Sequence, residues 1–220
     1  MSLAGLALWG SREWTRSGPS WALLALSLLL GPSILLATPW GVVQETGANG
    51  SLVGSIWYLS ALLGSIGGLV LLDRGRGLWA ELGPGSLTAV GGGVLLVVAL
   101  VHGTAAQLAV SVLGAAPAIS WQGGIACAGH WAAVGTFAFR ALGGTFPRAC
   151  LLLGACWWLP AAIGDGGAWE RLLWLFDPAR HLALTQGGPA TPLTSLVDTI
   201  PLVAWWVAAA LLPTRSVFRR

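Results

Sequence analysis

The chain has 220 residues, of which 55% are hydrophobic and only 9% charged, and its formal net charge at pH 7 is +3. A soluble domain carries roughly a quarter of charged residues, so this chain has too few charges to cover a surface in water. The small, scattered positive charge also argues against a nucleic-acid groove, and no nucleic acid is expected as a partner. These properties predict an all-α, polytopic membrane protein.

The first 20 residues precede any long apolar run and mix Trp, Leu and Arg, as in Trp9, Arg12 and Arg16. This composition predicts a helix that lies on the cytoplasmic surface of the membrane. A cleaved signal sequence is not expected. The first long apolar run begins only near Trp21, and it is long enough to stay in the membrane.

Six apolar runs are candidates for membrane spans, because a hydrocarbon core of about 30 Å needs roughly 20 helical residues per crossing. The runs are 21–38, 52–72, a stretch within 87–113, 121–142, 149–163 and 200–212. The third run is overlong and fits either one tilted helix or a helix followed by a half-helix. The last two are short. Pro201 falls where the sixth helix is expected to begin, a position at which its missing N–H has no partner in any case.

Glycine is frequent inside two of these runs, at Gly64, Gly67 and Gly68 in the second and at 91–93 in the third. Small residues let the backbones of membrane helices approach closely. We expect these glycines to serve helix packing, with a glycine-lined substrate path as the alternative.

The orientation follows from the arginines, because short loops rich in Arg stay in the cytoplasm. With the N-terminus inside and six crossings, nine arginines fall inside and two outside. The inside set is Arg12, Arg16, Arg74, Arg76, Arg140, Arg148, Arg215, Arg219 and Arg220, and the outside set is Arg171 and Arg180. Both termini are therefore expected in the cytoplasm, and the chain is expected in the inner (plasma) membrane as a multi-pass protein.

The cytoplasmic segment 73–86 is charged, then briefly amphipathic, then broken by Gly-Pro-Gly. It predicts a short helix that carries exposed Leu78, Trp79 and Leu82. Exposed apolar residues of this kind indicate a docking site for a soluble partner, and an ordinary interfacial anchor is the alternative.

The external segment 164–199 is the longest predicted loop. Trp169, Leu172, Leu173 and Phe176 lie within it at i, i+3, i+4 and i+7, the spacing of one helix face. We expect this piece to dip into the outer leaflet instead of projecting into water.

Two histidines fall inside the predicted spans, His102 in the third and His130 near the centre of the fourth. Ionisable residues at membrane depth mark functional sites, but a neutral His also bridges helices through hydrogen bonds. His102 and His130 are therefore candidates for a transport pathway or for helix bridging. A two-haem b-type cytochrome needs four such histidines and is excluded.

The residues that most enzymes require are missing. The chain contains no Lys, which a P-loop needs to reach the terminal phosphates, and it has no HExxH, CxxC or GxSxG. No catalytic or metal-ligating residue is predicted, and an enzyme is not expected. Cys127, Cys150 and Cys156 lie in apolar stretches and are expected to be small buried side chains.

Three segments carry a resemblance to a known family. Arg12-Glu13 lies in the helix before the first run, and the second run, 54–72, leads to Glu81-Leu-Gly-Pro-Gly-Ser86. The stretch Leu175-Phe-Asp-Pro-Ala-Arg-His-Leu182 precedes the last run. With these segments the chain resembles, over most of its length, the permease subunits of ABC-2 type transporters, a superfamily that includes the haem-exporter B subunits of cytochrome c maturation.

The resemblance implies a single permease domain over residues 1–220 and a separate ABC ATPase subunit that grips the cytoplasmic turn at Arg74, Arg76, Trp79 and Glu81. ATP is then bound by that partner, and this chain binds no cofactor. The permease pairs with a second copy or a related chain, as a homodimer or heterodimer in the bilayer, and exports a substrate. A haem-exporter B-like subunit and a non-transporting structural or assembly membrane protein are the alternatives.

Overall fold

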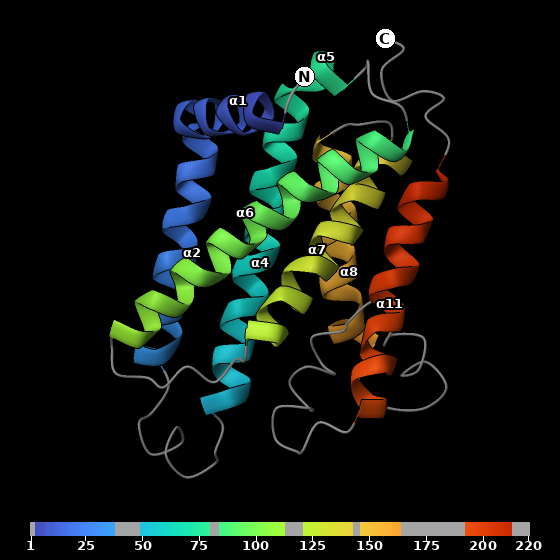
Figure 1. Ribbon diagram of the computed structural model, residues 1–220. Helices are drawn as coiled ribbons and strands as arrows, with labels where there is room; N and C mark the ends of the chain where they lie inside the picture. The colour runs from blue at the N-terminus through green and yellow to red at the C-terminus, as the bar shows by residue number, and fades with distance from the viewer. Residues whose placement is uncertain are drawn as a thin grey trace.

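The structure of the protein is a computed structural model that describes residues 3–37, 49–79, 84–112, 121–142, 146–163 and 192–212. These residues form eight α-helices, so the fold is all-α, as predicted (Figure 1). The helices are α1 (Leu3–Arg16), α2 (Gly18–Ala37), α4 (Asn49–Arg74), α5 (Arg76–Trp79), α6 (Pro84–Val112), α7 (Trp121–Ala141), α8 (Phe146–Ile163) and α11 (Pro192–Leu211).

Each of the six apolar runs coincides with a helix, in chain order α2, α4, α6, α7, α8 and α11. The overlong third run forms one continuous helix of 29 residues, α6, and not a helix followed by a half-helix. Among the described residues, the segments Ile56–Arg74 and Gly85–Val112 are long and apolar enough to cross a membrane, judged by length and composition.

The last helix corrects the sequence prediction. It begins at Pro192, so Pro201 lies inside α11 instead of in its first turn, and residues 192–199 are helical instead of part of a loop. A proline inside a helix removes one backbone hydrogen bond. α11 nevertheless continues through Pro201 to Leu211, and it packs against α7.

The centre of the bundle is formed by α4, α6 and α7, which pack on one another (Figure 1). α2 lies against α4 and α6 on one side, while α8 and α11 lie against α7 on the other. The buried core includes large side chains from all three central helices, among them Trp57, Leu69, Leu95, Trp131 and Phe139. The bundle is therefore organised around one continuous core.

The closest packing of α4 on α6 occurs at Gly64. A Cβ atom built there would lie 2.6 Å from Cα of Ala99 and 2.8 Å from the carbonyl oxygen of Val98, so only glycine fits. The obstructing atoms belong to the backbone of α6, which cannot rotate aside as a side chain can. Gly64 thus serves helix packing, as the sequence predicts.

The chain turns sharply between α1 and α2, and α1 lies across the end of α2 (Figure 1). Ser17 is the one residue between the two helices, and its Oγ accepts a hydrogen bond from the backbone N–H of Ser20 at 3.3 Å. This is the bond of an N-cap residue, which satisfies a donor that the first turn of a helix leaves free. Ser17 therefore fixes the start of α2.

Candidate functional site

The segment predicted to be a cytoplasmic turn that binds a partner contains α5, a single helical turn that follows α4 after Gly75. Its Trp79 is fully buried, so the prediction of an exposed Trp79 is wrong. The indole Nε1 donates a hydrogen bond to the carbonyl oxygen of Leu72 at 2.9 Å, and the ring meets that of Trp9 edge to face, with centroids 5.2 Å apart. Trp9 belongs to α1, which is distant in sequence, and for this reason the pattern of α5 alone could not show that its tryptophan is covered.

Gly75 makes this arrangement possible. A Cβ atom at this position would lie 2.6 Å from Nε1 of Trp79 and 2.7 Å from the ring of Trp9. Both contacts are closer than real Cβ atoms show. The Trp79 ring is held by its bond to Leu72, and the Trp9 ring contacts Trp79. The turn is thus fixed to α4 by the Trp79 bond and to α1 by the Trp9 ring, and both rings pack against Gly75.

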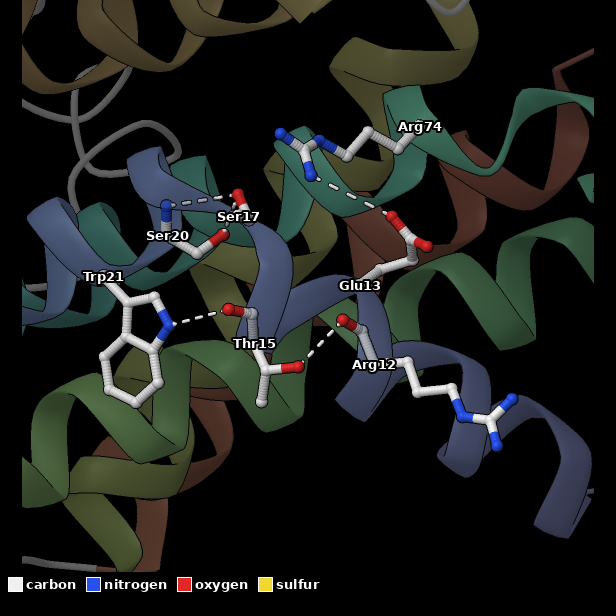
Figure 2. A network of polar contacts seen from close by, with 7 residues as sticks. All are labelled: Arg12, Glu13, Thr15, Ser17, Ser20, Trp21 and Arg74. Atoms are coloured by element: carbon white, nitrogen blue, oxygen red, sulfur yellow. Dashed lines mark hydrogen bonds and ion pairs between the residues drawn. The ribbon is translucent and has the colours of Figure 1, made fainter.

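The charged side chains of the turn form ion pairs. Arg74 lies 3.9 Å from Glu13 of α1, a pair drawn in Figure 2, and Arg76 bonds to Asp73. Both arginines remain partly exposed, and Leu78 is 39% exposed beside them. The outward surface of the turn is therefore made by Arg74, Arg76 and Leu78. The fourth predicted residue, Glu81, lies outside the described residues.

His102 is fully buried in α6 and connects three helices. Its Nδ1 lies 2.8 Å from Oγ of Ser27 in α2, and its ring meets Trp14 of α1 edge to face at 5.7 Å. The Ser27 hydroxyl donates to the carbonyl oxygen of Leu23 at 3.1 Å. With its only proton used there, Ser27 accepts from Nδ1–H of His102. These are the contacts of a helix-bridging residue.

His130 is also buried, near the middle of α7, but it has different neighbours. Its ring lies 5.2 Å from that of Trp131, which in turn lies 5.1 Å from the ring of Tyr58 in α4. Within the part of the chain that the structure describes, neither ring nitrogen of His130 has a hydrogen-bond partner. Trp131 thus makes the ring contact with α4, while His130 is buried beside it without a hydrogen bond among the described residues.

Arg140 was counted from the sequence among the cytoplasmic loop arginines, and the structure corrects this. It lies in the last turn of α7 and is only 3% exposed. Its guanidinium donates to Oγ1 of Thr88 in α6 and to the carbonyl oxygens of Ala209 and Leu212 at the end of α11. The last carbonyls of a helix lack intrahelical partners and favour a cation, which explains why an arginine is accommodated there.

The remaining predictions concern the cysteines, a metal site and the external loop. Cys127 and Cys156 are buried, as expected, and Cys150 is partly buried. No three His, Cys, Asp or Glu side chains come together as a metal site in the ranges from 3–37 to 192–212 that the structure describes. The predicted amphipathic piece of the external loop, 169–176, lies outside those ranges.

Comparison with known proteins finds no match: no protein-family model, no curated protein and no solved structure is similar to the chain.

Proposed function

We propose that the chain is a multi-pass permease subunit of an ABC-2 type transporter, resident in the inner (plasma) membrane with both termini in the cytoplasm. It carries an exported substrate with energy from ATP hydrolysed by a separate subunit. A second permease, identical or related, completes the transporter.

The placement in a membrane is supported by the outer surface of the bundle. Large apolar side chains are exposed on several helices, including Leu29 at 63%, Leu108 at 62%, Leu151 at 74% and Val203 at 56%. Monomeric soluble proteins rarely expose contiguous apolar surface of this kind. In a bilayer the same side chains face hydrocarbon, and the buried polar groups His102, Ser27 and Arg140 face the bundle interior.

The observation that carries the transporter proposal is the joining of α1 and α5 at one end of the bundle. The Trp9–Trp79 contact and the Arg74–Glu13 pair tie the two helices together, and both helices lie at the same end of α4 (Figure 1). An ATPase subunit that drives a permease needs a protruding element through which its movement reaches the spans. The fixed turn, with Arg74, Arg76 and Leu78 outward, meets this requirement.

This proposal revises the role of Trp79 in ATPase coupling. The buried indole anchors α5 to Leu72 of α4 and does not contact the partner. Arg74, Arg76 and Leu78 supply the contact surface, together with the predicted Glu81. The proposed interface is thus small, charged and centred on one leucine.

The proposal is tested by purifying the tagged chain from native membranes and identifying co-purified P-loop ATPases by mass spectrometry. Leu78→Glu places a charge at the centre of the proposed interface and should abolish recovery of the ATPase. Leu8→Glu is the matched control, because Leu8 is an exposed leucine of α1, and it should leave recovery unchanged.

Two outcomes contradict the proposal in different ways. If Leu78→Glu retains the ATPase, the docking surface is misplaced. If no ATPase accompanies the unaltered chain from native membranes, the transporter function is wrong, and the structural or assembly role becomes the better explanation.

A further inference from the structure

We propose that the outer side of the α1–α2 junction binds the headgroup of an anionic phospholipid, through Arg12 and Arg16, with its acyl chains lying along α2. The inference rests on the membrane placement in the proposed function but not on the ATPase.

The exposed face of α1 is basic. Arg12, Thr15 and Arg16 are all exposed and lie at i, i+3 and i+4, which places them on one side of the helix. Like charges at this spacing repel each other. Among the described residues, neither arginine takes part in an ion pair. The surface therefore holds two adjacent positive charges whose repulsion a bound anion would relieve.

The only acidic residue of α1, Glu13, is paired with another helix. Glu13 is held by Arg74, and Figure 2 shows the Arg12 guanidinium pointing away from that pair. Glu13 faces α4 because an i, i+1 step on a helix turns the side chain by about 100°. The negative charge of α1 is thus paired with α4, and among the described residues it forms no ion pair with Arg12 or Arg16.

A tryptophan is fixed at the boundary between this basic face and α2. Trp21 is 49% exposed, and its Nε1 donates to the carbonyl oxygen of Thr15 at 3.2 Å, as Figure 2 shows. The bond directs the indole N–H toward the end of α1 and leaves the ring uncovered. Tryptophan with one polar edge and an apolar ring favours the headgroup level of a bilayer.

Below Trp21 the outer surface of α2 is apolar. Leu26, Leu28 and Leu29 are exposed, the last at 63%. Leu29 lies eight residues beyond Trp21, a rise of about 12 Å along the helix, which falls within the roughly 15 Å depth of one leaflet's hydrocarbon. A basic face, an indole and a leucine surface follow one another in the order of a phosphate, a glycerol region and acyl chains. This continuity favours a lipid over a soluble acidic protein, which would leave the leucines uncovered.

The experiment measures thermal unfolding of the purified full chain in neutral detergent, followed by tryptophan fluorescence. The chain is titrated with dioleoyl phosphatidylglycerol, with phosphatidylcholine of the same acyl chains, with inorganic phosphate, and with a polyglutamate peptide. We expect phosphatidylglycerol to raise the Tm by several degrees and the other three to produce no comparable rise.

The double variant Arg12→Gln/Arg16→Gln should need about 25-fold more phosphatidylglycerol for half of the Tm shift, about fivefold for each charge. Arg148→Gln removes one exposed arginine near the start of α8 and is the control for net charge; it should leave the titration unchanged. Both arginines of the double variant are exposed, so its Tm without lipid should match that of the unaltered chain.

Several results would overturn the inference. They are an equal Tm shift with phosphatidylcholine, an equal shift with inorganic phosphate or polyglutamate, and an undiminished response in Arg12→Gln/Arg16→Gln. An equal shift with phosphatidylcholine would show that the headgroup is not recognised. An equal shift with inorganic phosphate or polyglutamate would assign the surface to a free anion or an acidic protein. An undiminished response in the double variant would show that the two arginines have no role. None of these results depends on ATPase recovery, so failure here and failure of the transporter proposal are distinguishable.

Discussion

The bond between His102 and Ser27 joins residues that lie 75 positions apart in the chain. The sequence identifies His102 as a polar group inside an apolar run, because that contrast is local. It cannot identify the partner, since Ser27 is one of many serines and its position depends on how α2 packs on α6. Sequence reasoning therefore finds the residue but not its contact.

We predict that Ser27→Ala and His102→Leu each lower stability and that their effects are not additive. A buried hydrogen bond of this kind contributes about 1 kcal/mol, and that share is lost only once. The measurement is a double-mutant cycle on thermal or denaturant unfolding in detergent. Additivity to within about 0.3 kcal/mol would show that the bond contributes nothing, and that His102 is retained for another reason, such as a transport pathway.

The close contact at Gly64 predicts a loss of stability when its side chain is enlarged. Gly64→Ala should destabilise the protein by about 1–3 kcal/mol, because the new methyl group meets the backbone of α6 at Ala99 and Val98. Gly93→Ala is the matched control, a helical glycine of α6 with open space around its Cβ position. It should be neutral or stabilising by up to about 1 kcal/mol in the same unfolding assay. Equal losses for the two variants would contradict the packing role of Gly64.

At the scale of elements, the number and position of the long helices follow from apolar runs, but their ends do not. The start of α11 is the clearest case: Pro201 and Asp198 suggest a boundary, yet the helix begins at Pro192. Pro192 and Pro201 both suit the first turn of a helix, and local signals alone do not decide between them. The burial of Trp79 under α1 cannot be predicted from α5 alone, because the covering helix is distant in sequence.

Arg140 of α7 bonds to α6 and to the end of α11, and its removal should mainly destabilise α11. Arg140→Leu removes the donors to Thr88 and to two carbonyl oxygens at the end of α11. We expect a loss of about 2–4 kcal/mol in stability and faster hydrogen exchange in residues 203–211, with exchange in 18–31 unchanged. Arg148→Leu, an exposed arginine of α8, should change stability by less than about 0.5 kcal/mol. Unchanged exchange in α11 would show that the arginine does not hold that helix.

For the whole molecule, the sequence predicts an even number of crossings from the distribution of arginine. The burial of Arg140 removes one arginine from the exposed cytoplasmic set, but eight of the remaining ones are still assigned inside and two outside. The sidedness depends on the sum over several loops and not on one residue, and it stays a prediction.

Reporter fusions test this topology directly. Fusions of green fluorescent protein to either terminus should fluoresce, and alkaline phosphatase inserted near residues 45 or 116 should be active, since those loops are predicted outside. A terminus that reports the opposite side from its counterpart would require an odd number of crossings. The proposal of a six-span permease would then be wrong.

The order of the helices along the chain has a consequence for how the bundle is assembled during synthesis. α2, α4 and α6 pack on one another, and all three are synthesised before α7. α11 is made last, and by then Arg140 of α7 is already available to hold its final turn. A chain truncated before residue 192 would therefore leave the Arg140 guanidinium without its two carbonyl acceptors, and we expect such a fragment to be degraded faster than the full chain.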